Sequence, residues 1–314
     1  MPPAGMAPAG MAIAGGAMSG MAMSGGAMSG GGQNPVMRAH RLLCSGFITD
    51  AEFRAALGSH RADLTSVGRY LALPMGERPG LTPYFDRAFY LVSNPDVAAA
   101  GFDPLLHFIE TGAAELRAPH PLIDLRFIAQ SDPLVLGERP APEAIFEVLD
   151  YDLIAPSPYF DPAEYRERLG PAAPGHGMLR HFLATGLAKG IAVNPYFDPA
   201  WYAAHHDDVK ADPYLALRHF IVLGDVEGRA AGPRFNGALY RARYPDIAAA
   251  EVPPLWHFLL RGRFEGRQVP ADAPAEAVMP PLRLVENDAV PRFMGAKKMS
   301  LHQTGFQEVI AAAE

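Results

Sequence analysis

A motif that recurs every 37 or 38 residues constrains this chain more than any other feature of its sequence. Its first landmark is an apolar residue that recurs at successive spacings of 38, 37, 37 and 38, namely Phe85, Ile123, Phe160, Phe197 and Phe235. A second landmark, usually followed by Phe, recurs at spacings of 38, 36, 38 and 38, namely His107, Ile145, His181, His219 and His257. Two independent landmarks that share one period indicate tandem repeats of a single structural unit.

A weaker copy of the motif precedes these five. Phe47 lies 38 residues before Phe85, and Tyr70 lies 38 residues before Phe108. We therefore number six copies along the chain by their first landmark: copy 1 from Phe47, copy 2 from Phe85, copy 3 from Ile123, copy 4 from Phe160, copy 5 from Phe197 and copy 6 from Phe235. Copy 3 has diverged, because it lacks the histidine and has Asp150 in place of the final glycine.

Each copy carries explicit signals for helix starts. In "FDPAEY", Asp161 is a good N-cap and Pro162 falls at the first helical position, where its missing N–H costs nothing. Glu164 is expected to complete a capping box, and Tyr165 to pack back onto Phe160 as a hydrophobic staple. The same staple is predicted for Phe85 with Tyr90, Phe197 with Tyr202, and Phe235 with Tyr240.

Two further helix starts follow within a copy, at "NPDVAAA" from Asn94 and at "DPLLHFIETG". In the second, Asp103 is expected to cap the helix and Gly112 to end it in the left-handed conformation. Such short helices have one apolar side that only neighbouring copies can bury. The fold class predicted is all-α: a tandem array of about six 36–38-residue helical repeats, solenoid-like or compact and pseudo-symmetric, behind a disordered N-terminal tail.

Composition suggests three regions. Residues 1–37 form a Gly/Ala/Met-rich tail predicted to be disordered, 38–270 the helical repeat array, and 271–314 a linker with a C-terminal capping helix from about Thr304. The methionines of the tail offer thioether ligands for Cu(I), but this segment has no His or Cys to support such a site.

Charge and cysteine content exclude several functional classes. The net charge of −7 provides no basic field for nucleic acid. No run of 18 apolar residues predicts a membrane span, and no export signal is recognisable, so we expect a cytoplasmic location. The single cysteine, Cys44, excludes an internal disulfide framework and is expected to be a small buried hydrophobe.

Three groups of residues invite a chemical interpretation. The recurring histidines are expected to bond to neighbouring groups, because equivalent residues of an array cannot converge on one ligand. The run from His205 to Asp208 resembles a metal site, yet adjacent residues point in different directions on a helix. Asp150 and Asp152 form an Asp-x-Asp pattern, which some glycosyltransferases use to hold the metal of a sugar nucleotide.

No nucleotide-binding loop and no nucleophile elbow occurs in the sequence. We therefore predict no catalytic, cofactor-binding or metal-binding residues and no cofactor. The repeated residues are predicted to be structural: Phe85, Asp86, Tyr90, His107, Phe108, Gly112, Phe160, Asp161, Tyr165, His181, Gly186, Phe197, Asp198, Tyr202, His219, Gly224, Phe235, Tyr240, His257 and Gly262.

The unit "FDxxxYLxxNPDVAAAGxxPLxHFxxxGxxEGR" resembles a helical repeat of bacterial proteins. That repeat accompanies glycosyltransferases of cell-surface polysaccharide synthesis, including rhamnan-synthesis-type proteins, and some large calcium-binding secreted proteins. Here it is carried by "FDRAFYLVSNPDVAAAGFDPLLHFIETG" and by the copies from Phe160, Phe197 and Phe235, and the resemblance extends from Phe47 to Arg267. It implies an accessory segment, because catalysis in those proteins belongs to separate domains.

The function expected is a non-catalytic helical-repeat interaction or scaffold module tied to bacterial surface-polysaccharide biosynthesis. Its partner would be a protein of unknown identity, and carbohydrate is a second possible ligand. Two alternatives remain open. One is a glycosyltransferase-associated or truncated sugar-transfer enzyme, and the other is a metal-binding or assembly role of the methionine-rich tail.

Overall fold

The computed structural model of the chain describes residues 34–269. The tail, apart from its last few residues, and the C-terminal capping helix predicted near Thr304 lie outside the described residues. The first helix, α1, begins at Pro35, which is three residues before the predicted start of the array.

The described part of the chain is mostly helical and contains little strand, as the all-α class predicts. Its α-helices are α1 (Pro35–Leu43), α2 (Asp50–Leu57), α3 (Leu64–Ala72), α4 (Arg87–Ser93), α5 (Pro95–Ala100), α6 (Pro104–His107), α7 (Leu125–Ser131), α8 (Pro142–Asp150), α9 (Pro162–Leu169), α10 (Met178–His181), α11 (Pro199–His205), α12 (Pro213–His219), α13 (Asp225–Glu227), α14 (Gly237–Arg243), α15 (Pro245–Ala250) and α16 (Pro254–His257). Short 3₁₀ turns occur at η1 (Met75–Glu77) and η3 (Gly170–Ala172). Strands β1 (Ala230–Gly232) and β2 (Phe235–Asn236) form one small antiparallel pair.

Four π-helical turns continue the last α-helix of copies 2, 4, 5 and 6. They are η2 (Phe108–Gly112), η4 (Phe182–Gly186), η5 (Phe220–Gly224) and η6 (Phe258–Gly262). A π-turn contains one residue more per turn than an α-helix and is rare. Its recurrence at one place in the repeat therefore indicates a specific local cause.

The N-caps lie where the sequence predicts them. Asp86, Asp124, Asp161, Asp198 and Asn236 each accept hydrogen bonds from amides of the helix that follows. The capping-box partner proposed for Asp161 is bound elsewhere, because the Glu164 carboxylate lies 2.7 Å from Arg263 and 3.3 Å from Arg168. All four predicted staples are confirmed, with ring centroids 5.2 to 5.6 Å apart.

Consecutive copies meet through the residue that precedes the first landmark. Tyr84 of copy 2 packs on Phe146 of copy 3, with ring centroids 6.2 Å apart. Tyr159 of copy 4 packs in the same way on Phe220 of copy 5, and Tyr196 of copy 5 on Phe258 of copy 6, at 6.5 and 5.1 Å. These contacts bury the apolar side of one copy against the next.

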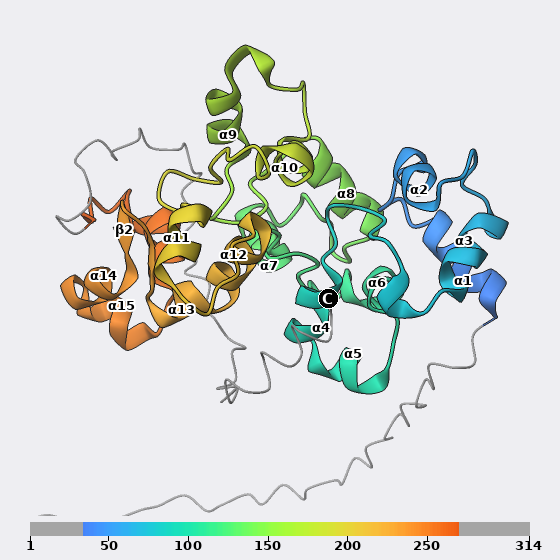
Figure 1. The fold of residues 1–314 in the computed structure, drawn as a ribbon, viewed down its shortest axis with the longest axis horizontal. Coiled ribbons are helices and arrows are strands. Elements are labelled where there is room, and N and C mark those ends of the chain that lie inside the picture. Colours follow the sequence, from blue (N-terminus) through green and yellow to red (C-terminus); the bar gives the residue numbers. More distant parts are fainter. Residues whose placement is uncertain (1–33, 270–314) are drawn as a thin grey trace, which may run out of the picture.

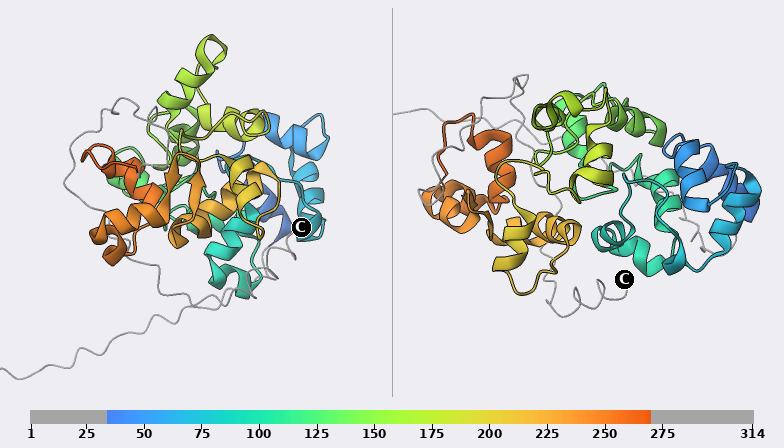
Figure 2. Two further views of the ribbon diagram at one scale, coloured as in Figure 1. Left: turned by 60° about the vertical axis from the view of Figure 1, so that its left-hand side comes forward. Right: turned by 45° about the horizontal axis from the view of Figure 1, so that its top comes forward.

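Copies that are three apart also touch. Glu52 of copy 1 bonds to Arg180 of copy 4 at 2.5 Å, and Asp86 of copy 2 lies 3.6 Å from Arg218 of copy 5. Arg180 and Arg218 occupy the same repeat position, immediately before the histidine. Copies 1 and 2 therefore lie beside copies 4 and 5, respectively. Helices α1–α3 lie at one end of the molecule and α14–α15 at the other (Figures 1 and 2).

Within residues 34–269, no helix has both the length and the apolar content required to cross a bilayer.

Candidate functional site

The repeated tyrosine, histidine and glycine come together in four copies as one buried arrangement. The tyrosine hydroxyl is hydrogen-bonded to Nδ1 of the histidine 16 or 17 residues later. The O···N distances are 2.9 Å for Tyr90–His107, 3.0 Å for Tyr165–His181, 3.0 Å for Tyr202–His219 and 3.1 Å for Tyr240–His257. The phenylalanine that follows each of these histidines packs on the same tyrosine ring.

The glycine that ends each π-turn provides room for this tyrosine. A Cβ atom at Gly112, Gly186, Gly224 or Gly262 would lie only 2.0 to 2.4 Å from the tyrosine oxygen. The prediction that Gly112 ends its helix in the left-handed conformation is wrong, because Gly112 is not among the residues with positive φ, and the equivalent Gly224 has φ −60°. The left-handed residue comes four positions later, for example at Gly228.

The Tyr–His pairs of copies 2, 5 and 6 are electrically neutral near neutral pH. Burial raises the pKa of Tyr90, Tyr202 and Tyr240, and raises that of Tyr165 to about 12. Burial also lowers the pKa of His107, His219 and His257. The four tyrosines are fully buried and each hydroxyl is bonded to its histidine, so the arrangement holds the helix of the tyrosine against the helix of the histidine.

The arginines of the "EGR" segments form ion pairs within their own copies. Arg117 bonds Glu115 and Asp96, which belong to its own copy. Arg229 with Asp208 and Arg267 with Asp246 repeat that pattern at 2.6 and 2.7 Å. Each of these arginines therefore ties the end of its copy to an earlier segment of the same copy.

The residues from His205 to Asp208, whose sequence resembles a metal site, have different partners in the structure. His205 stacks on Trp201, with ring centroids 3.8 Å apart, while His206 lies 3.3 Å from the carbonyl oxygen of Ala230. Asp208 is paired with Arg229. Within the described residues, no group of three or more His, Cys, Asp or Glu side chains is arranged to hold a metal ion.

Asp150 and Asp152 serve as acceptors inside the array. Asp150 ends α8, as predicted, and accepts hydrogen bonds from Arg180 at 2.7 Å and from the Tyr84 hydroxyl at 3.1 Å. Asp152 accepts the Met178 amide at 2.9 Å and pairs with Arg166 at 3.1 Å. Their shared Asp-x-Asp spacing thus has a structural use in copy 3.

The expectation for Cys44 is wrong, because its side chain is exposed. It follows the last residue of α1, and its sulfur lies 3.6 Å from Nε2 of His40. The two tryptophans differ: Trp256 is buried in the core, whereas Trp201 is half-buried beside His205.

Sequence reasoning missed a polar residue three positions before the first landmark of copies 2 to 5. These residues are buried and form the turn into the next copy, namely Thr82, His120, Ser157 and Asn194. Asn194, for example, accepts the amides of Tyr196 and Phe197 at 3.0 and 3.1 Å. Their spacings of 38, 37 and 37 were available as a signal, although the residue type varies.

Sequence reasoning also missed caps supplied by a neighbouring copy. Helices α6 and α12 have their own N-cap aspartates, but α10 and α16 do not. Asp152 of copy 3 caps α10, and Asp225 of copy 5 accepts the amides of Leu255 and Trp256 at the start of α16, at 2.8 and 2.9 Å. Asp225 is fully buried, which raises its pKa to about 6, and also accepts the Tyr159 hydroxyl.

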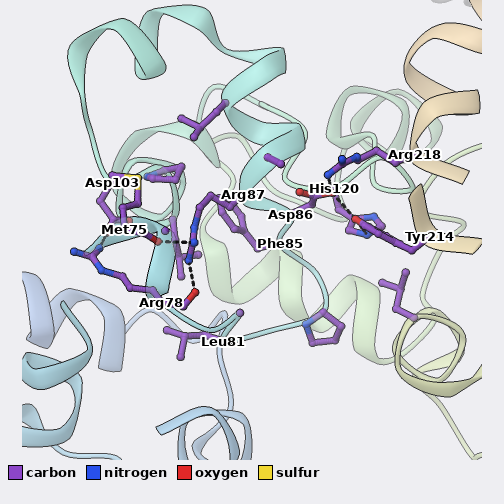
Figure 3. A pocket seen from close by; sticks show the side chains of 18 of the residues that line it. Met75, Arg78, Leu81, Phe85, Asp86, Arg87, Asp103, His120, Tyr214 and Arg218 are labelled. Atoms are coloured by element: carbon purple, nitrogen blue, oxygen red, sulfur yellow. Dashed lines mark hydrogen bonds and ion pairs between the residues drawn. The ribbon is translucent and has the colours of Figure 1, made fainter. Parts of the chain in front are cut away.

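A pocket of about 690 Å³ lies where copies 2, 4 and 5 meet (Figure 3). The connector that precedes copy 2 forms one wall, with Met75, Arg78 and Leu81. Helix α12 of copy 5 forms another, with Tyr214 and Arg218. The starts of α4 and α6 supply Phe85, Asp86, Arg87 and Asp103.

Both carboxylates of the pocket wall already have partners. Asp103 caps α6 and is paired with Arg78. Asp86 caps α4 and accepts the Tyr214 hydroxyl at 2.5 Å, with Arg218 3.6 Å away. The Tyr214 hydroxyl also meets Nε2 of buried His120 at 3.1 Å. Burial lowers the pKa of that histidine to about 4, so its ring is neutral.

Comparisons with known proteins find only short similarities. The chain is 79% identical over 33 residues to the hydrogenase expression/formation protein HupD of Bradyrhizobium diazoefficiens, which covers 10% of this chain and 17% of that protein. It is 66% identical over 38 residues to HoxM of Cupriavidus necator, covering 12% and 19%, and 70% identical over 33 residues to HupD of Rhizobium leguminosarum bv. viciae, covering 10% and 16%. The chain thus spans less than a fifth of the length of these curated relatives. No protein-family model matches the chain, and no solved structure does.

Proposed function

We propose that this chain is a non-catalytic helical-repeat module of about six copies that binds a protein partner. The observation that carries the proposal is the use of its repeated polar residues. The Tyr–His pairs, the "EGR" arginines and the helix-capping aspartates are bonded within the array. These residues recur in the copies because they build the fold. A binding function is therefore expected to use residues on the outer surface.

The diverged copy 3 offers a surface suited to a partner. Tyr151 is 56% exposed and Leu153, two residues later, is 59% exposed, so the segment after α8 turns two large apolar side chains outward, and Leu134 of the same copy is 88% exposed. Exposed apolar side chains supply binding energy when a partner covers them. The resemblance of the repeat supports a partner from bacterial surface-polysaccharide biosynthesis.

Affinity capture from a native lysate tests this proposal. The full-length chain is expected to retain a specific protein, and the double substitution Tyr151→Asp/Leu153→Asp to lose it. Leu64→Asp is the matched control, because Leu64 is 44% exposed on α3 of copy 1. Capture of no specific protein, or equal capture by both variants, would contradict the proposal.

A second candidate function rests on the similarity to hydrogenase expression/formation proteins. Identity of 79% over 33 residues is high for so short a segment. We therefore propose as the alternative that the chain takes part in hydrogenase formation. Deletion of its gene would then lower hydrogenase activity in cells, and expression of the full chain would restore it. Unchanged activity after deletion would remove this candidate.

The sugar-transfer alternative gains no support from residues 34–269. Asp150 and Asp152 are held by arginines and a helix start, as described above. The role considered for the methionine-rich tail lies outside the described residues.

A further inference from the structure

The pocket between copies 2, 4 and 5 carries polar residues that the repeat itself does not need. Arg87 is the first residue of α4, where copies 4 and 5 have Pro162 and Pro199. Proline suits this position because no amide hydrogen is required there. An arginine at this place is therefore dispensable for the helix and is specific to copy 2.

Tyr214 is a second departure from the repeat. It lies five residues before the histidine of copy 5, where copies 2 and 6 have the apolar Phe102 and Val252 and copy 4 has His176. Its ring lies against His120, with centroids 5.7 Å apart, and its hydroxyl bonds to Asp86. Two copies therefore place unusual polar side chains in the wall of one pocket.

The arginines and carboxylates of the pocket do not balance. Arg78 and Arg218 face Asp103 and Asp86, respectively, while His120 is neutral. Arg87 is bonded instead to two backbone carbonyl groups, those of Met75 at 2.6 Å and Arg78 at 2.8 Å. Three guanidinium groups therefore meet two carboxylates, and one positive charge at Arg87 remains without a formal counter-charge.

The Arg87 guanidinium is also held in place before any ligand arrives. Its two terminal nitrogens are anchored by the carbonyl oxygens of the connector (Figure 3). Each of these nitrogens has a second hydrogen to donate. A guanidinium fixed in this way loses little side-chain entropy on binding an oxyanion, and its planar fork matches the two oxygens of a carboxylate.

We propose that this pocket binds a small organic carboxylate, whose oxygens bond to Arg87 and whose apolar body packs against Leu81, Phe85 and Leu91. All four residues line the pocket. A volume of about 690 Å³ falls within the range of small-molecule sites. One unbalanced positive charge suits a monoanion. This site is separate from the protein-binding surface on copy 3.

Binding of benzoate to the full-length chain tests this inference, with benzamide as the neutral isostere, in ligand-observed NMR titrations. Benzoate is expected to bind about tenfold or more tightly than benzamide, because the charge-assisted hydrogen bonds are lost in the amide. Arg87→Gln should weaken benzoate binding by a similar factor. Arg126→Gln is the matched control, since Arg126 is an exposed arginine in the first turn of α7.

A second variant keeps the test decisive if Arg87→Gln does not fold, which circular dichroism would show. Ala88→Phe fills the pocket from its wall without changing any charge, and it should abolish benzoate binding. The inference is overturned if benzoate does not bind, if benzamide binds equally well, or if the folded Arg87 and Ala88 variants both keep wild-type affinity.

Discussion

Copy 3 and the four copies with a Tyr–His pair differ at three positions that change together. In copy 3 the tyrosine is replaced by Ile128, the histidine by Ile145 and the glycine by Asp150, and both isoleucines are fully buried. Its helix α8 stays α-helical to the end, with the Tyr151 amide bonded to the Glu147 carbonyl four residues back at 3.0 Å. In copy 2 the corresponding bond spans five residues, from Ala113 to Phe108, at 2.8 Å.

This difference indicates that the π-turn, the glycine and the Tyr–His hydrogen bond depend on one another. The tyrosine hydroxyl needs a partner in the core, which the histidine provides, and it needs space, which the glycine provides. Without the hydroxyl, neither requirement remains, so an apolar pair and an aspartate are tolerated. This dependence can be tested by substituting one of these residues at a time.

The largest effect is expected from Gly186→Ala. Its Cβ would lie 2.0 Å from the hydroxyl oxygen of Tyr165, so the variant should lose about 3 kcal/mol of unfolding free energy in urea titrations. Tyr165→Phe in the same chain removes the clashing oxygen and should restore part of that loss. The control is Gly68→Ala in α3, where nothing lies within 4 Å, and which should stabilise by up to about 1 kcal/mol. Equal effects of the two alanines would contradict the account.

The next largest effect concerns Asp225 and Asp152, the two aspartates that cap a helix of the following copy. The pKa of Asp225 is about 6 in the folded state, above its ordinary value, so folding takes up a proton between these two pKa values. Stability from this group is therefore greatest at low pH and declines as pH rises from about 4 to 6. The advantage of the wild type over Asp225→Asn should shrink by about 2 kcal/mol between pH 4.5 and 7.5.

Asp152 of copy 3 provides the contrast for this measurement. Burial raises its pKa too, but Arg166 lies 3.1 Å away and favours the charged form. Asp152→Asn should therefore alter the pH dependence less than Asp225→Asn. A larger change for Asp152→Asn in urea titrations at both pH values would show that the arginine does not act in this way.

A smaller effect is expected from Tyr240→Phe, which leaves a buried nitrogen of His257 without its partner. The loss of unfolding free energy should be about 1.5 kcal/mol. In copy 3, Tyr151→Phe should change stability by less than about 0.5 kcal/mol, because that side chain is 56% exposed. Thermal unfolding of the two variants side by side provides the measurement, and similar losses would argue against a structural role for the pair.

The smallest effect is expected at the end of the second helix of a copy, where copies 2 and 6 have different residues. Gly101 ends α5 with φ +65°, whereas Glu251 ends α15 with φ +52° and is exposed. A side chain in the left-handed region costs about 1 kcal/mol, so Glu251→Gly should stabilise the protein by about that amount. The reverse exchange, Gly101→Glu, should destabilise it in the same thermal-unfolding assay. Destabilisation by Glu251→Gly would contradict this explanation.

The sequence predicted the helical class, the N-caps and the staples, because each depends on residues within one short segment. Asp161 and Tyr165 illustrate this, since both act on their own helix. The role of Gly186 was not predictable in the same way. Helix-ending glycines usually adopt a left-handed conformation, and only the position of Tyr165 in space shows why this glycine does not.

Long-range features were also beyond the sequence pattern. Nothing in the spacing shows that Tyr214 meets Asp86, 128 residues earlier, so the pocket could not be predicted. Nor does the spacing show that Arg229, at the end of copy 5, pairs with Asp208 of its own copy. Periodicity identifies equivalent residues but not which of them become neighbours.

The contacts between copies three apart, Glu52 with Arg180 and Asp86 with Arg218, have a consequence for how such a chain can change length. In a simple linear stack, a copy can be lost and the ends rejoined, since each copy depends on its two neighbours alone. Here, deletion of copy 3 would bring copy 1 opposite copy 5 and copy 2 opposite copy 6. Glu52 would then face Arg218, which occupies the same repeat position as Arg180, but Asp86 would face Trp256, the residue before the histidine of copy 6, in place of an arginine. The number of copies is thus linked to the contacts between copies that are three apart. Duplication or loss of one copy would require compensating substitutions in other copies.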